Sequence, residues 1–158
     1  MPEISLRITI AAPAEKVWEM VAHHFDRVDE WATVVHASYA LPGPPVVAEA
    51  PVAGRVCRTG LPVLRQVSEH IVAYDEIART LTYQAELLPG LLPQARNQWE
   101  VIPVGPARSQ VTTHASVQTH GILGALLYVL VRPYLRHAGR RFLRDLRRHL
   151  EHAQASAG

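Results

Sequence analysis

The sequence predicts an α+β fold in which an antiparallel sheet packs against one long C-terminal helix. Residues 3–10 alternate apolar and polar side chains, short strand-like segments fill the middle of the chain, and residues 121–153 carry a helical apolar repeat. Strands and helices are segregated along the chain, which favours an antiparallel sheet over a doubly wound one. At 158 residues, the chain is expected to form a single domain over 1–158.

Two short helices are predicted directly after the first strand. The alternation at 3–10 has the period of two that is typical of a half-buried strand. Pro13 fits the first turn of a helix, where its missing N–H leaves no hydrogen bond unmade. Val17 and Trp18 then begin an apolar helix face, and a second short helix is predicted at 26–31.

Six further strands are predicted between this helical region and residue 119. Their ends are marked by turn residues, among them Pro-Gly-Pro-Pro at 42–45 and Asp-Glu at 75–76. The predicted strands are 33–40, 54–59, 63–74, 79–87, 97–104 and 109–119.

The long C-terminal helix is predicted from apolar residues that recur every three or four positions. Pro133 is expected to kink or interrupt it, because proline lacks a backbone N–H and clashes with the preceding turn. The positions predicted to face the sheet are Leu123, Leu127, Leu130, Tyr134, Ala138, Phe142, Leu146 and Leu150.

Composition excludes several classes of protein. Apolar residues make up 48% of the chain and charged residues 19%, which excludes a disordered chain. One cysteine, Cys57, excludes an internal disulfide and a cysteine-based zinc cage. The longest apolar stretch, 121–131, is shorter than the roughly 20 residues of a membrane span. Residues 1–10 lack the features of a signal peptide, so we expect a soluble cytoplasmic protein.

The predicted helix has an apolar first half and a basic second half. Residues 121–131 are apolar nearly all round, so they could close a cavity, form a dimer contact or touch a membrane. Residues 132–148 hold seven arginines against one acid, Asp145, which is expected to pair with Arg141 or Arg148. This basic segment is either a solvated face or a docking surface for an anionic membrane. Nucleic-acid binding is disfavoured because no exposed aromatic residues are interleaved. Arg141 is expected to reach inward, and Arg140, Arg144, Arg147 and Arg148 to face outward.

Four motifs in chain order resemble the START-like, or SRPBCC, superfamily. They are Ile-Thr-Ile-Ala-Ala-Pro-Ala-Glu-Lys-Val-Trp-Glu-Met-Val from residue 8, followed by Phe25 and Trp31; the pair of segments 69–75 and 79–83; Gln-Trp-Glu-Val-Ile-Pro at 98–103; and the closing helix around 146–151. The nearest branch is the polyketide cyclase/dehydrase and lipid-transport proteins. The resemblance implies a helix-grip fold: a seven-stranded antiparallel sheet wrapped round the C-terminal helix, with a hydrophobic cavity between them.

Glu69 is the first candidate for chemistry. Val67, Glu69 and Ile71 share one face of their predicted strand, and the two apolar neighbours indicate that this face points inward. An inward carboxylate could act as a general acid or base, or bind a polar group of a ligand. The alternative is a buried structural ion pair with Arg65 or Arg55.

Arg65 and Tyr83 complete the candidate catalytic set. Arg65 lies four residues before Glu69, where it could hold a carboxylate or enolate, as the resemblance to aromatic polyketide cyclases implies, or lie in water at the rim. Tyr83 follows the family's tyrosine position. The residues predicted to line the cavity are Tyr39, Val67, Glu69, Ile71, Tyr83, Trp99, Thr113, Leu130, Tyr134, Arg141 and Phe142.

These observations lead to one functional hypothesis and one alternative. The first is a binder of a hydrophobic small molecule, such as a polyketide or lipid, and, if it is an enzyme, a polyketide cyclase or dehydratase. The alternative is a non-enzymatic lipid or quinone carrier, or an adaptor that docks on a membrane or protein through the basic helix. No metal or cofactor is expected, since neither the nine histidines nor Cys57 form a pattern of convergent ligands. The protein is expected to be a monomer or a homodimer.

Overall fold

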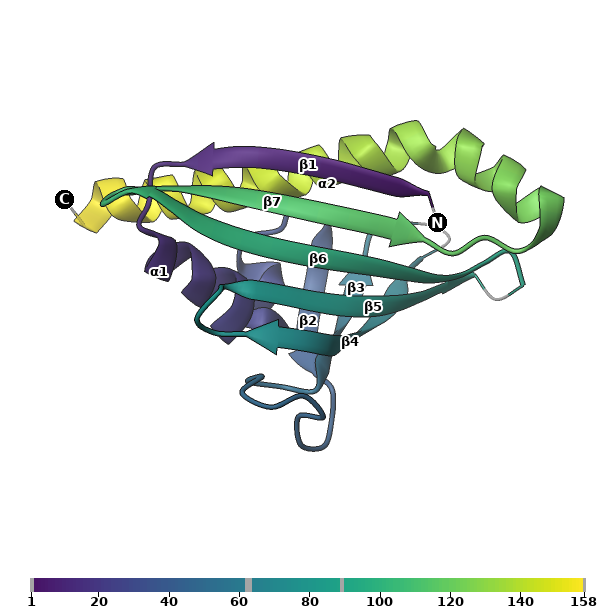
Figure 1. The fold of residues 1–158 in the computed structure, drawn as a ribbon, viewed down its shortest axis with the longest axis horizontal. Helices are drawn as coiled ribbons and strands as arrows, with labels where there is room; N and C mark the ends of the chain where they lie inside the picture. Colours follow the sequence, from purple (N-terminus) through teal and green to yellow (C-terminus); the bar gives the residue numbers. More distant parts are fainter. Residues whose placement is uncertain (1, 62–63, 89, 158) are drawn as a thin grey trace.

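Seven antiparallel strands form one sheet in the order β1-β7-β6-β5-β4-β3-β2. The computed structural model describes residues 2–61, 64–88 and 90–157. The sheet wraps round a long C-terminal helix, as Figure 1 shows, and the predicted helix-grip fold is therefore confirmed. The strands are β1 (Glu3–Ile10), β2 (Val35–Ala40), β3 (Gly54–Thr59), β4 (Gln66–Asp75), β5 (Thr80–Leu88), β6 (Leu92–Gly105) and β7 (Arg108–Val117).

Two of the predicted strands begin three or more residues from the predicted start, whereas the other strand ends lie within two residues of the prediction. The segment predicted at 63–74 is β4 and begins at Gln66; residue 63 lies outside the described residues. The segment predicted at 97–104 is β6 and begins at Leu92, because the hairpin with β5 continues to the pair Leu88–Leu92. Pro93 hides this extension in the sequence, since proline cannot donate to a sheet ladder.

The segment after β1 forms three short helical turns: α1 (Ala14–Trp18), a π-helical turn (Glu19–His23) and a 3₁₀ turn (Phe25–Glu30). Pro13 stands immediately before α1, which it helps to start. Val17, Trp18 and Phe25 are almost completely buried, so these turns close one end of the core.

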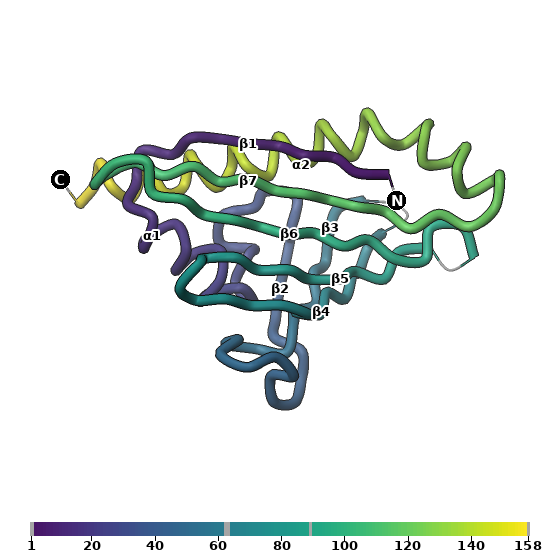
Figure 2. The backbone as a smooth tube through the Cα atoms, viewed as in Figure 1, coloured from purple at the N-terminus to yellow at the C-terminus, as the bar shows by residue number. Residues whose placement is uncertain are grey.

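The C-terminal helix α2 (Gly121–Ala157) runs through Pro133 without interruption, so of the two expected effects, a kink or an interruption, the interruption is wrong. Pro133 is exposed, and a backbone group that it leaves unpaired can be hydrated on the solvent side. Figure 2 shows that the axis curves over the first half of the helix. The predicted apolar stripe holds in the second half, where Leu146 and Leu150 are buried.

In the first half of α2 the helix is rotated from the predicted stripe. Gly124 and Tyr128 face inward, while Leu123 and Leu130 are 72% and 77% exposed. A Cβ atom on Gly124 would lie 2.6 Å from the carbonyl oxygen of Leu91. The glycine therefore permits a close approach between helix and loop, which sets the rotation.

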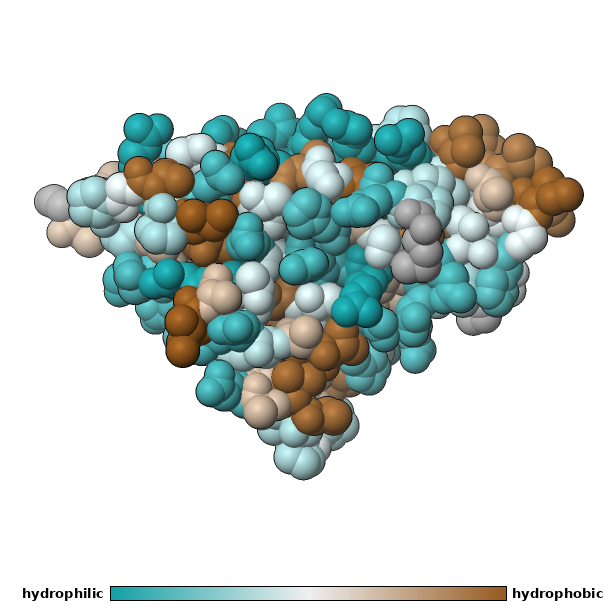
Figure 3. All heavy atoms as spheres, viewed as in Figure 1, coloured by the Kyte–Doolittle hydropathy of each residue, from teal (hydrophilic) through white to brown (hydrophobic). Residues whose placement is uncertain are grey.

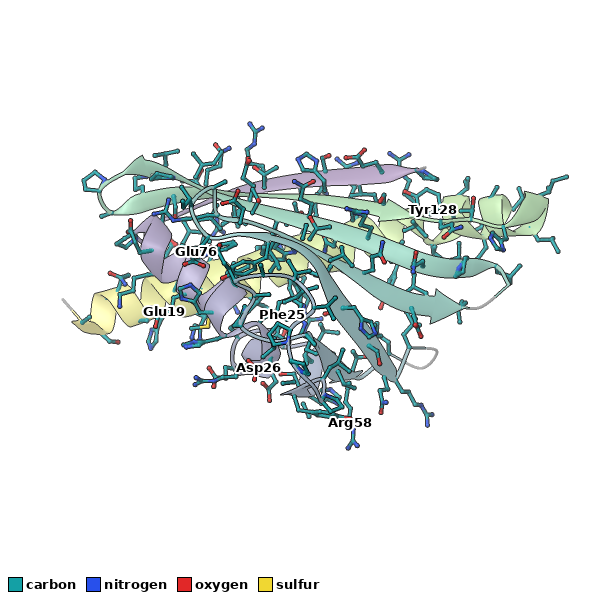
Figure 4. All side chains as sticks on the ribbon, turned by 60° about the horizontal axis from the view of Figure 1, so that its bottom comes forward. Glu19, Phe25, Asp26, Arg58, Glu76 and Tyr128 are labelled. Atoms are coloured by element: carbon teal, nitrogen blue, oxygen red, sulfur yellow. The ribbon has the colours of Figure 1, made fainter. Side chains whose placement is uncertain are left out.

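The apolar core has two parts. The larger lies between the short helical turns, the sheet and the second half of α2. The smaller lies under the first half of α2 and joins Leu92, Val117 and Tyr128; Figure 4 labels Tyr128 there. A cavity lies against the middle of α2, where eight helix residues between 134 and 143 line it.

Candidate functional site

A cavity of about 370 Å³ lies between α2 and the sheet, a size typical of small-molecule sites. Four strands supply its wall, with Glu69 on β4, Tyr83 on β5, Trp99 on β6 and Thr113 on β7. Trp99 and Thr113 are direct cross-strand partners and so point to the same face. The remaining lining residues are Val34, Leu61, Asn97, Tyr134, Leu135, His137, Ala138, Gly139, Arg141, Phe142 and Leu143.

Glu69 is both a cavity residue and a member of a buried ion pair. Its side chain is 15% exposed, and its Oε2 atom accepts a hydrogen bond from Nε of Arg55, the residue directly opposite on β3. Of the two partners considered from sequence, the structure selects Arg55 and not Arg65. Glu69 therefore forms the structural ion pair and lines the cavity with the same side chain.

Arg55 is held from several directions behind the cavity wall. It is only 4% exposed, and its guanidinium donates a hydrogen bond of 2.9 Å to the carbonyl oxygen of Phe25. The guanidinium also lies 4.0 Å from the centroid of the Phe25 ring and 5.2 Å from that of Tyr83, both within cation–π range. Burial alone would lower the pKa of Arg55, but the charge and hydrogen bond of Glu69, together with the neighbouring Tyr83 and Cys57, outweigh burial and raise the pKa above its usual value. The arginine is therefore permanently charged and orients the carboxylate.

Tyr83 presents a neutral hydroxyl at the same wall. Its oxygen accepts hydrogen bonds from the side-chain amide of Asn97 at 3.0 Å and the indole N–H of Trp99 at 3.3 Å. Burial, and then the negative charge of Glu69, raise the pKa of Tyr83 above its usual value. Because the oxygen accepts both bonds, the hydroxyl proton is left to donate to a ligand.

Aromatic rings form the apolar part of the wall. Phe142 lies 6.0 Å from Trp99 and 4.6 Å from Trp31 between ring centroids, both edge-on. Such edge-to-face packing fixes the rings beyond simple burial. A flat, apolar ligand fits between walls of this kind.

Arg141 lies at the exposed edge of the cavity. It donates to the hydroxyl of Thr33 at 3.2 Å while lining the cavity, in line with the expectation that it reaches inward. Asp145 has a partner other than the expected Arg141 or Arg148: its buried carboxylate accepts from the backbone N–H and the hydroxyl of Thr33, at 3.0 and 2.7 Å. Thr33 thus ties α2 to the loop before β2.

The structure brings seven of the predicted lining residues together and leaves four out. Those that line the cavity are Glu69, Tyr83, Trp99, Thr113, Tyr134, Arg141 and Phe142. Tyr39 is 45% exposed, and its cross-strand row with Val56 and Ser68 is adjacent to the row that holds Arg55 and Glu69, so its side chain points to the opposite face of the sheet. Ile71 is buried in the main core, and Val67 is half-buried outside the cavity lining. Leu130 is exposed because of the helix rotation described above.

Arg65 also lies away from the cavity. It precedes β4, is exposed, and lines a surface depression with Arg58 and His36. The expectation that it could hold an enolate inside is therefore wrong, and the rim interpretation is the one that the structure supports.

Two polar lining residues, Asn97 and His137, were not found from sequence. Asn97 had a usable signal, since it is two residues from Trp99 on β6 and must share its face. His137 lies on α2, where the rotation of the helix was needed to place it.

Cys57 faces the core beside the ion pair. Burial raises the pKa of its thiol to about 12, against the opposing charge of Arg55. The thiol is therefore protonated at neutral pH and is a poor nucleophile. Among the described residues, no group of three or more His, Cys, Asp or Glu side chains is placed to hold a metal ion.

Comparison with known protein families identifies the family to which the chain is similar. A family model described as polyketide cyclase / dehydrase and lipid transport matches residues 1–151. No curated protein matches the sequence.

Solved structures share the fold over almost the whole chain. The aromatase/cyclase ZhuI from Streptomyces sp. R1128 has a TM-score of 0.76 and 15% identity, covering 99% of this chain and 98% of that one. A START superfamily protein from Mycobacterium smegmatis has a TM-score of 0.66 and 12% identity, covering 99% of both chains. The di-domain ARO/CYC protein BexL, from the BE-7585A biosynthetic pathway, has a TM-score of 0.68 and 17% identity, covering 96% of this chain and 47% of that one. At such low identity, these likenesses show the fold alone.

Proposed function

Because the chain belongs to the polyketide cyclase/dehydrase and lipid transport family, we propose that it binds a hydrophobic carbonyl compound between α2 and the sheet and catalyses its cyclisation or dehydration. The observation that carries the proposal is the convergence of polar groups on one wall of an otherwise apolar cavity. Glu69 and Tyr83 both line it, and Arg141 lies at its edge. A simple carrier needs few such groups, whereas proton transfer needs at least two.

The proposed reaction begins with removal of a proton next to a substrate carbonyl. Oε2 of Glu69 is engaged by Arg55, so Oε1 is the oxygen that takes the proton. The Tyr83 hydroxyl donates to the enolate oxygen, where negative charge develops. Arg141 supplies positive charge at the cavity edge.

Ring closure then follows from the shape of the cavity. The enolate carbon attacks a second carbonyl of the same molecule, a carbon–carbon bond forms, and the new alkoxide takes the proton back from Glu69. Glu69 then removes another proton next to the carbonyl and returns it to the hydroxyl group, which leaves as water while the carbon–carbon double bond forms. Holding both ends of the substrate between rigid aromatic walls makes the attack intramolecular, which is a large part of such catalysis.

The test is turnover of a linear phenyl triketone, followed by mass spectrometry as the loss of one water. Wild-type protein should accelerate the loss, and Glu69→Gln and Tyr83→Phe should each slow it by roughly a hundred-fold or more. Arg65→Gln is the matched control, because Arg65 is exposed outside the cavity. Near-UV circular dichroism checks that each variant is folded. Equal rates in all four proteins would overturn the assignment.

A second candidate function, that of a carrier on anionic membranes, is favoured by the outer surface of α2. Its first half exposes large apolar side chains, which Figure 3 shows at one end of the molecule; they are Ile122, Leu123, Leu126, Val129 and Leu130. Its second half and β1 form a groove of about 440 Å³ whose lining includes Arg7, Arg136, Arg140, Arg144 and Arg147. Insertion of the apolar end would place these arginines near lipid phosphates. A second copy is a poorer partner, since it would bring two basic helices together.

Vesicle co-sedimentation tests this candidate. Wild-type protein should bind vesicles of phosphatidylserine and phosphatidylcholine at low salt, and replacing Arg144, Arg147 and Arg148 by glutamine should weaken binding by roughly 1 kcal/mol per charge. The control replaces Arg58, Arg65 and Arg96, which are exposed elsewhere, with the same change in net charge. If wild-type protein does not co-sediment with anionic vesicles at low salt, the membrane interpretation is wrong. Within the described residues, no helix has a segment long and apolar enough to cross a membrane.

A further inference from the structure

A second cavity, of about 400 Å³, lies under the first half of α2. The ends of β5, β6 and β7 supply Leu87, Leu88, Leu92 and Val117, and the helix supplies Leu127 and Val131. Apart from Tyr134, every residue that lines it is leucine or valine. Apart from the hydroxyl of Tyr134, no side chain of this lining can bind a polar group, so the cavity favours hydrocarbon.

This apolar cavity adjoins the polar cavity described above. Leu61, Tyr134 and Leu135 line both. Tyr134 is 50% exposed, so it is not fixed in place by surrounding core. The two cavities are therefore separated by a few side chains that a ligand can displace.

The polar cavity in turn lacks partners for its own groups. The side-chain oxygen of Asn97 is buried without a hydrogen-bond partner among the described residues. The Tyr83 hydroxyl accepts two hydrogen bonds and has its proton left to donate. A ligand group that both donates and accepts hydrogen bonds, such as a hydroxyl on an aromatic or polyketide ring, satisfies both residues.

We infer that the ligand is amphipathic: a hydroxylated or carbonyl-bearing ring occupies the polar cavity, and an unbranched alkyl substituent extends past Tyr134 into the apolar cavity. This inference rests on the proposed small-molecule binding and names the class of molecule. The alkyl chain supplies affinity through burial, and the polar groups of the ring set its orientation.

A series of para-alkylphenols tests the inference by isothermal titration calorimetry. The probes are para-ethylphenol, para-butylphenol, para-hexylphenol and para-octylphenol, which share one head group. Affinity for wild-type protein should rise about four-fold for each added CH₂ group, the factor that corresponds to roughly 0.8 kcal/mol. The rise should stop when the chain fills the apolar cavity.

Val131→Phe fills the apolar cavity, and Val129→Phe is its matched control. Val131 lines the cavity, whereas Val129, two residues away on the same helix, is 66% exposed. Val131→Phe should bind para-ethylphenol like wild-type protein and lose the gain with chain length. Val129→Phe should keep that gain. Unchanged binding of the short probe also shows that Val131→Phe is folded.

The possible outcomes separate this inference from the proposed function. If no phenol of the series binds wild-type protein, small-molecule binding itself fails. If the phenols bind with equal affinity whatever their chain length, or if Val131→Phe keeps the full gain, the apolar cavity does not bind the alkyl chain. Binding of the ring in the polar cavity would still hold. A change of oligomeric state in Val131→Phe, measured by analytical ultracentrifugation, would show that the apolar cavity is a contact between copies and would overturn the inference.

Discussion

Replacing Arg55 by methionine should strongly destabilise the fold, because it removes one member of a buried ion pair and leaves the other uncompensated. Removal of one partner of such a pair costs about 3 to 5 kcal/mol. Arg55 is 4% exposed and bonds both Glu69 and the carbonyl oxygen of Phe25. Methionine replaces its aliphatic stem but none of these bonds.

The contacts allow the size of the effect to be worked out. The unpaired carbonyl oxygen of Phe25 contributes about 1 to 3 kcal/mol, and the lost cation–π contacts about 1 to 2 kcal/mol. The Glu69 side chain is 15% exposed and faces the cavity, so water can partly solvate its freed carboxylate. The expected loss therefore lies near the lower end of the range, at about 3 kcal/mol.

Urea unfolding followed by tryptophan fluorescence measures this loss. Arg58→Met, at an exposed position on the same strand, is the control and should change stability by less than about 0.5 kcal/mol. The double variant Arg55→Met with Glu69→Leu should be less destabilised than the sum of the two single variants, since neither charge is left unpaired. A loss below about 1 kcal/mol for Arg55→Met, or simple additivity in the double variant, would refute the buried pair.

Three further outcomes are expected. First, the folded protein holds the Cys57 proton up to about pH 12, whereas the unfolded thiol loses it near pH 9.0. The thiol alone should therefore lower stability by about 1 kcal/mol between pH 9 and 10, and Cys57→Ala should reduce the fall seen in thermal unfolding by that amount. The buried Tyr83, whose pKa is also raised, contributes a further fall that the variant keeps. Second, a methyl group on Gly124 would lie 2.6 Å from a carbonyl oxygen, so Gly124→Ala should lower the free energy of unfolding by about 1 kcal/mol despite better helix propensity. An unchanged urea midpoint would contradict this close approach. Third, glutamine at Arg144, Arg147 and Arg148 together should change stability by less than about 1 kcal/mol in the same assay. A larger loss would show that these side chains pack against the fold.

The sheet could be predicted from sequence because the alternation of apolar and polar residues within a strand indicates which face points inward. Alternation of apolar and polar residues placed Glu69 inward, and the same period placed Trp99. Tyr39 was misplaced because aromatic character alone does not distinguish the two faces. Its row alternates with the row of Arg55 and Glu69 and so faces away from the cavity, but pairing across strands is not visible in the sequence.

The rotation of α2 could not be predicted because its first half is apolar on every side. Hydrophobic periodicity locates a buried face only where polar residues mark the opposite one. Between Gly121 and Val131 that contrast is missing, and the inward side is decided instead by Gly124 meeting the loop at Leu91. The apolar cavity under this half of the helix was missed for the same reason.

In the proposed function, a structural and a chemical role coincide in the carboxylate of Glu69. A side chain that transfers protons must be held in one orientation before the substrate arrives. Here the orientation comes from the cross-strand register, which places Arg55 opposite Glu69, and from Phe25, which holds the guanidinium by its carbonyl group and its ring. One carboxylate oxygen is thereby committed to the fold and the other is left for chemistry. A Glu69 without its arginine would be a flexible group in an apolar cavity, so the structural ion pair is the condition under which the proposed base can work.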